Sequence, residues 1–79
     1  MNSRKKIENA RELEFAVFCI ENLADEIGVG AEQVYEVLTR KSDILNDYIV
    51  PEYEILHTQS KEYIIQDILE VMKKRGIRA

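Results

Sequence analysis

The feature that most constrains the fold is a long apolar stripe with helical spacing in the first third of the chain. Apolar side chains recur there at steps of three and four residues: Leu13, Ala16, Val17, Ile20, Leu23, Ala24 and Ile27. This spacing places them on one face of a helix. Phe15, Phe18 and Cys19 widen the stripe, as is typical of a helix at the centre of a bundle. The sequence therefore predicts a helix over about residues 5–27, closed by Gly28 in the left-handed conformation.

Three further helices are predicted by the same spacing. The second covers about residues 31–40, the third begins near residue 43, and the last covers about residues 61–75. The third contains Pro51, the only proline, which lacks a backbone donor and disfavours helix at the residue before it. We expect a break at Val50–Pro51 and a restart at Pro51. The sequence thus predicts an all-α fold, a small four-helix bundle whose third helix is kinked or broken near Pro51.

The length and composition indicate one globular unit. A chain of 79 residues leaves room for a single helical domain over residues 1–79. There is no run of about 18 apolar residues that would span a membrane, and the N-terminus lacks the apolar core of a secretory signal. Cys19 is the only cysteine, so no internal disulfide is expected. These observations predict a cytoplasmic protein with no membrane segment.

Charge is distributed unevenly along the chain. Residues 12–70 carry fourteen acidic side chains against three basic ones, whereas both ends are net basic. We expect the basic ends, residues 1–5 and 76–79, to fray. An acidic body repels phosphate backbones and favours basic partner surfaces. The charge pattern therefore favours a protein partner over nucleic acid. Self-association is a separate possibility, because a chain of this size with so many apolar residues can bury a face against a second copy.

No arrangement of residues in the sequence identifies a catalytic, cofactor or metal site. His57 is the only histidine, and a metal site needs several ligands. A general base likewise needs a nucleophile and a pocket beside it. We expect His57 to end a helix, where its cation would meet the helix dipole or its ring would bond a backbone carbonyl. We therefore predict a non-enzymatic protein with no catalytic residue, no cofactor and no metal.

Tyrosines and carboxylates gather between residues 42 and 63. The residues predicted to bind a partner are Asp47, Tyr48, Glu52, Tyr53, His57 and Tyr63. Tyrosine is enriched at interfaces because it combines a large contact area with a low entropic cost. An aromatic patch rimmed by carboxylates would suit a basic groove on a partner. The alternative is that these tyrosines lie at the margin of the core and support the break at Pro51.

Residues 24–37 have the spacing of a helix-turn-helix unit, with small and apolar residues at the positions where two helices would cross. A small DNA-binding regulator that uses this unit is the alternative function. The outward positions of its second helix are Glu32, Gln33, Glu36, Thr39 and Arg40. Two carboxylates against one arginine oppose the charge of a DNA backbone, so this alternative is the less favoured one.

Four segments carry a resemblance to a known family: LEFAVFCIENLADEIGV, VYEVL, SDILNDYIVPEYEILHTQ and EYIIQDILEVM. Together they resemble a small bacterial family catalogued as a domain of unknown function, number 3791, over residues 13–72. The family carries no established activity. The resemblance implies a gene that often lies beside ADP-ribosyltransferase-like toxins. It therefore implies an antitoxin-like or accessory role for a partner protein encoded nearby.

Overall fold

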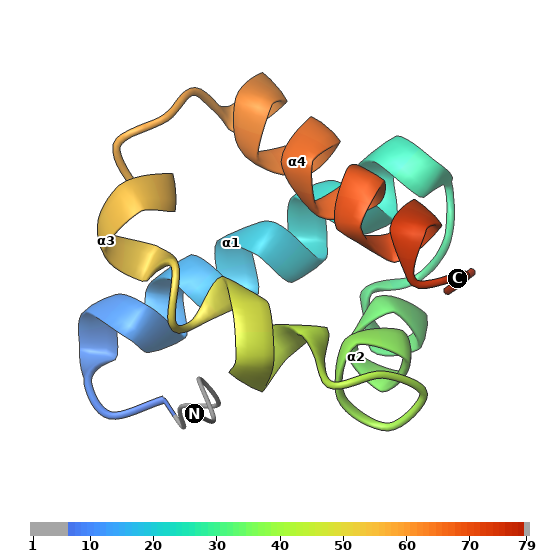
Figure 1. The fold of residues 1–79 in the computed structure, drawn as a ribbon, viewed down its shortest axis with the longest axis horizontal. Helices are drawn as coiled ribbons and strands as arrows, with labels where there is room; N and C mark the ends of the chain where they lie inside the picture. Colours follow the sequence, from blue (N-terminus) through green and yellow to red (C-terminus); the bar gives the residue numbers. More distant parts are fainter. Residues whose placement is uncertain (1–6, 79) are drawn as a thin grey trace.

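The computed structural model describes residues 7–78, which form helices and turns without a strand. The elements in order are α1 (Ala10–Ile27), α2 (Ala31–Thr39), η1 (Leu45–Ile49), α3 (Tyr53–Leu56) and α4 (Lys61–Lys74). Figure 1 shows α1 crossing the middle of the molecule with the other elements around it. The predicted all-α class is confirmed for this range. The four-helix bundle is not confirmed, because two short helices, η1 and α3, stand in place of the third long one.

Local hydrogen bonds set both ends of α1. The side chain of Asn9 accepts from the backbone N–H of Glu12, and the Glu12 carboxylate accepts from the N–H of Glu8, each at 2.9 Å. These bonds satisfy amides at the start of the helix, so α1 begins at Ala10 and not at residue 5 as predicted. Residues 5 and 6 lie outside the described residues. At the other end Gly28 adopts φ 86°, as predicted, and its N–H donates to the Ala24 carbonyl.

The segment predicted as a broken third helix forms a π-helical turn, a proline turn and one turn of α-helix. The N–H of Val50 donates to the carbonyl of Leu45, five residues back, at 2.9 Å. Val50 keeps helical angles, φ −68° and ψ −46°, instead of the extended ones favoured before proline. The predicted break near Pro51 is therefore present. The predicted restart is wrong, because Pro51 lies in the turn and α3 begins at Tyr53.

α4 has the caps that its sequence predicts. The hydroxyl of Ser60 accepts from the N–H of Tyr63 at 3.1 Å and so caps the first turn. Gly76 adopts φ 70° after the last turn, and the N–H of Ile77 then donates to the carbonyl of Met72 at 2.8 Å. The side chain of Ile77 packs against the core. The chain after α4 is thus held against the core as far as Ile77. The other predicted frayed end, residues 1–5, lies outside the described residues.

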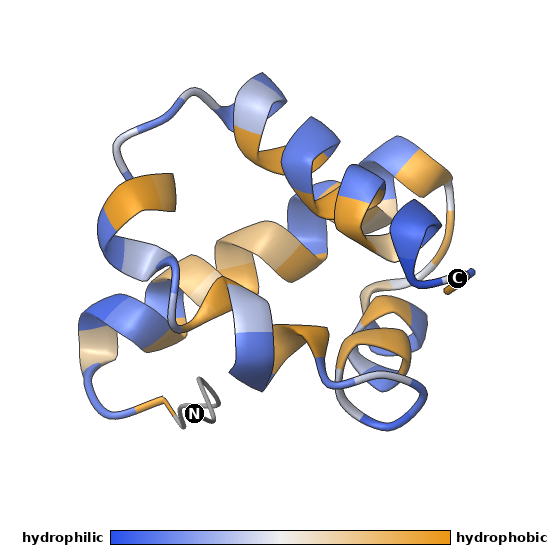
Figure 2. Ribbon diagram, in the orientation of Figure 1, coloured by the Kyte–Doolittle hydropathy of each residue, from blue (hydrophilic) through white to orange (hydrophobic). Residues whose placement is uncertain are grey.

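The core lies where the other helices meet α1. Figure 2 shows α4 turning its apolar side toward α1 and its hydrophilic side outward. α1 contributes the buried side chains of Phe15, Ala16, Cys19, Leu23 and Ala24. The side chains packed around them are Val34, Val37, Leu38, Ile44, Leu45, Ile49, Val50, Leu56, Ile64, Ile65, Ile68 and Met72.

α1 carries more apolar surface than its neighbours cover. Leu13 is 51% exposed, Val17 44% and Phe18 36%. The expectation that Leu13 and Val17 lie inside the core is therefore wrong, because the buried face centres on Cys19 and Leu23. Both margins of the apolar stripe on α1 therefore reach the surface, at Leu13 and Val17 on one side and at Phe18 on the other.

Candidate functional site

A row of four rings joins α1 to α3. The rings of Phe15 and Phe18 are stacked, with centroids 6.3 Å apart. The ring of Tyr53 meets Phe15 edge-on at 5.4 Å and 75°, and His57 stacks on Tyr53 at 4.6 Å and 13°. Both arrangements are among those that aromatic pairs favour. The two inner rings, Phe15 and Tyr53, each contact two other rings of the row, which limits their rotation.

Helical spacing delivers these rings to one place. Phe15 and Phe18 are three residues apart on α1, and Tyr53 and His57 are four apart across α3, so each pair shares one face of its helix. The N–H of His57 donates to the Tyr53 carbonyl at 3.0 Å, which fixes the single turn of α3. The turn at Pro51 directs this face toward α1.

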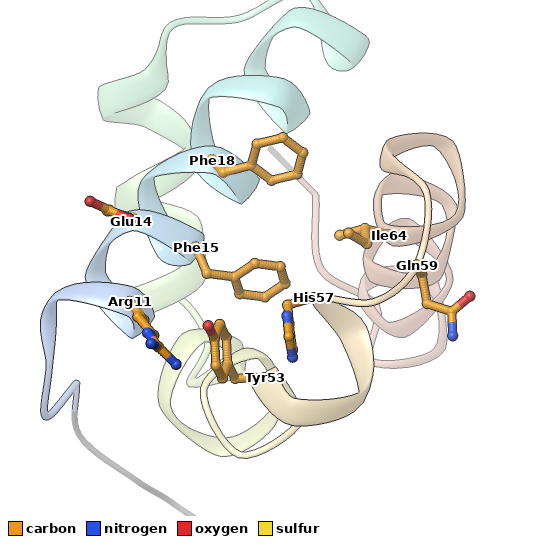
Figure 3. Close-up of a pocket in the computed structure, with 8 residues that line it drawn as sticks. All are labelled: Arg11, Glu14, Phe15, Phe18, Tyr53, His57, Gln59 and Ile64. Atoms are coloured by element: carbon orange, nitrogen blue, oxygen red, sulfur yellow. The ribbon is translucent and has the colours of Figure 1, made fainter.

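The row borders a groove of about 320 Å³ between α1, α3 and the start of α4, which we call the aromatic groove. Its lining residues are Arg11, Glu14, Phe15, Phe18, Tyr53, His57, Gln59 and Ile64. Figure 3 shows Phe15, Phe18 and Ile64 directed into the groove and Glu14 directed away from it. This volume is at the lower end of the range of about 300–1,000 Å³ for small-molecule pockets. It accommodates one or two apolar side chains better than a large cofactor.

Two of the six residues predicted to bind a partner line the aromatic groove, Tyr53 and His57. His57 ends a helix as predicted, since it is the C-cap of α3, but its ring stacks on Tyr53, a contact that was not predicted. Tyr63 is exposed on α4, and Glu52 is half-buried just before α3. The structure thus divides the six residues, with Tyr53 and His57 in the groove and with Glu52 and Tyr63 near the Tyr48 hydroxyl. Their role in partner binding stays a prediction.

Asp47 and Tyr48 connect η1 to α4. The Asp47 carboxylate accepts from the Arg75 guanidinium at 2.9 Å, and the Tyr48 hydroxyl donates to the Asp67 carboxylate. Burial is the main cause that raises the pKa of Tyr48 far above its ordinary value, and the hydrogen bond to Asp67 adds to it. The phenol therefore stays a neutral donor. Each of these two residues thus links η1 to α4, and for Tyr48 this is close to the supporting role kept open for the tyrosines.

Cys19 is inert in this fold. Its side chain is fully buried, and burial raises the pKa of the thiol to about 12. The thiol is therefore protonated at neutral pH, and the thiolate that acts as a nucleophile or metal ligand is scarce. Among residues 7–78 no group of three or more His, Cys, Asp or Glu side chains could hold a metal ion. In the same range no helix combines the length and the apolarity needed to cross a membrane.

Sequence reasoning assigned Phe15, Phe18 and Ile64 to the core and so missed their part in the aromatic groove. The available signal was the apolar circumference of α1, which exceeds what a single packed face needs.

For the predicted helix-turn-helix unit, Glu32 and Glu36 are exposed on α2, and Arg40 lies 3.6 Å from the Glu36 carboxylate. DNA binding by this unit stays a prediction, and the charge of its outer face does not favour it.

Comparison with known proteins gives a family and no function. No curated protein and no solved structure matches this chain. The family model described as "Protein of unknown function (DUF3791)" matches residues 14–75. This range includes all four rings of the row and all of α2, η1, α3 and α4. The chain therefore belongs to the DUF3791 family, as its resemblance implied.

Proposed function

We propose that this chain is a non-enzymatic protein-interaction module that binds a protein partner through the aromatic groove. The observation that carries the proposal is the row of four rings from Phe18 to His57, which borders an open apolar groove at the surface. Rings that are already fixed lose little side-chain entropy on binding. Aromatic residues in small pockets that exclude water commonly supply most of the binding energy of an interface.

The occupant that fits this groove is an apolar side chain on a basic segment of the partner. Phe15 and Ile64 provide an apolar floor, since both side chains are buried beneath the groove. The surrounding body carries fourteen acidic side chains over residues 12–70, which attracts a basic segment. Arg11 lies at one rim, where its guanidinium N–H groups can donate to a carbonyl of the partner backbone.

The first partner to test is the protein encoded beside this gene, for which the module would be antitoxin-like or accessory. This finer role rests on the family resemblance, and the aromatic groove supplies a surface for it. A cytoplasmic location is part of the same proposal.

Co-expression of the tagged chain with the neighbouring gene product, followed by pull-down and calorimetry, tests the proposal. Phe18→Ala should weaken binding about 30-fold, the effect of losing one interface anchor worth about 2 kcal/mol. Ile55→Ala is the matched control, because Ile55 is an exposed apolar residue on α3 that does not line the groove. Equal effects of the two variants, or a partner that is not retained at all, would overturn the proposal.

A further inference from the structure

A second apolar surface lies on the other margin of α1, beside α2. Leu13 and Val17 are exposed there, Ile20 is half-buried, and Tyr35 of α2 is 51% exposed. Leu13, Val17 and Ile20 are spaced by four and three residues, so they form a stripe about 10 Å long on one side of the helix. Glu21, exposed on the outer side of α1, separates this stripe from Phe18 and the aromatic groove.

The stripe borders a groove of about 570 Å³ whose rim is acidic, and we call it the acid-rimmed groove. Its lining residues are Val17, Ile20, Glu21, Ala31, Glu32, Tyr35 and Glu36. Glu36 lies near Arg40, whereas no basic side chain in the described part of the chain pairs with Glu21 or Glu32. The groove thus combines an apolar floor with two carboxylates that are open to a cationic partner.

We propose that the acid-rimmed groove binds a basic amphipathic helix of a partner protein. Two packed helices with an apolar stripe between them form the kind of surface into which an amphipathic helix lays its apolar face. Apolar residues at steps of three and four on the incoming helix would contact Val17, Ile20 and Tyr35. Its lysines or arginines would meet Glu21 and Glu32. An acidic helix would be repelled by the same carboxylates.

A second copy of this chain fits the acid-rimmed groove less well. α4 is the described helix that carries basic residues in its last turn, Lys73 and Lys74. Its apolar stripe, however, is already buried against α1 through Ile65, Ile68 and Met72. Beside Lys73 and Arg78, the described part of a second copy offers a hollow lined by Leu69 and Ile77 and not the exposed apolar face of a helix.

Fluorescence anisotropy with the full chain and a labelled helical peptide tests the proposal. The probe is a leucine–lysine peptide of about 18 residues with leucine at steps of three and four, long enough to form a helix. The comparison peptides have glutamate in place of lysine, or the same composition with the periodicity scrambled. We expect the leucine–lysine peptide to bind about tenfold or more tightly than either comparison peptide.

Protein variants then locate the peptide on the surface. Glu21→Lys/Glu32→Lys should weaken binding about tenfold or more, as should Tyr35→Ser. Glu62→Lys/Glu70→Lys, on α4, makes the same change in net charge and should leave the affinity nearly unchanged. Circular dichroism of each variant checks that the fold is retained.

Five results would overturn the assignment. If the leucine–lysine peptide does not bind, the groove is not a site for a basic helix. Equal binding of the scrambled peptide would indicate attraction by bulk charge alone, and so would an equal loss of affinity in both charge variants. Loss of peptide binding in Phe18→Ala, with Tyr35→Ser unaffected, would place the helix in the aromatic groove. A dimer in sedimentation that Tyr35→Ser dissociates would make a second copy the occupant. None of these results tests binding at the aromatic groove. That binding is tested separately, by the affinity of Phe18→Ala for the neighbouring gene product.

Discussion

Replacing Leu23 with alanine tests whether α1 forms the centre of the core. The side chain of Leu23 is 0% exposed and belongs to the apolar cluster that all the longer helices share. Leu→Ala substitutions at buried sites cost about 3–5 kcal/mol, because the lost transfer free energy and the remaining cavity both destabilise. A domain of this length has a free energy of unfolding of roughly 4–12 kcal/mol. We therefore expect Leu23→Ala to remove at least a quarter of that stability and to lower Tm by about 12 °C or more.

Leu13→Ala is the matched control on the same helix. The substitution and the change in helix propensity are identical, but Leu13 is 51% exposed, so its cost should be about 1 kcal/mol or less. Urea denaturation followed by far-UV circular dichroism measures both free energies of unfolding. A cost below about 1 kcal/mol for Leu23→Ala, or equal costs at the two sites, would show that the buried face of α1 has been misassigned.

The remaining predictions concern two residues, Cys19 and Gly28. The buried Cys19 thiol should react with a thiol reagent only as fast as the protein unfolds, and rapid labelling of the native protein would contradict its burial. Burial raises the pKa of the Cys19 thiol from its ordinary value of 9.0 to about 12, so its contribution to stability is full below pH 9.0 and is lost as the pH rises toward 12. Urea titrations across this range should show a shallower loss for Cys19→Ala than for the parent, and the Tyr48 phenol contributes to the loss in both proteins. Gly28→Ala should cost about 1–2 kcal/mol because φ is 86°, although a Cβ there meets nothing within 4 Å. Gly28→Asn should cost less in the same urea assay, and equal costs would argue against a conformational cause.

The end of α1 at Gly28 could be predicted because capping depends on local sequence. The starts of α1 and α3 could not be predicted in this way. The π-helical turn could not be predicted, since a bond to the fifth residue back leaves no periodic pattern in a five-residue segment. The rule for the residue before proline also failed at Val50. Its side chain is buried, so packing against the core outweighs the local preference for extended angles.

Only part of the candidate site could be predicted from the sequence. Tyr53 and His57 could be selected by residue type, but their partners Phe15 and Phe18 lie far away in the chain and look like ordinary core residues. Periodicity indicates that α1 is apolar around most of its circumference, and it does not indicate which margins the neighbouring helices leave uncovered. Asp47 and Tyr53 were both predicted to bind a partner because they lie in the same segment rich in tyrosines and carboxylates. The turn between them nevertheless directs Asp47 toward Arg75 of α4.

The wide turn at η1 also sets which side chains reach the aromatic groove. A helical residue turns the chain by about 100°, so removing one residue from 45–49 would advance every later position by one place. Glu54 and Thr58 would then occupy the places of Tyr53 and His57, and the stacked pair would become a carboxylate and a hydroxyl. The length of a five-residue segment is thus a determinant of specificity. A deletion there that keeps the wide turn would thus present a polar groove on an otherwise similar core, whereas an insertion would place Glu52 and Leu56 there.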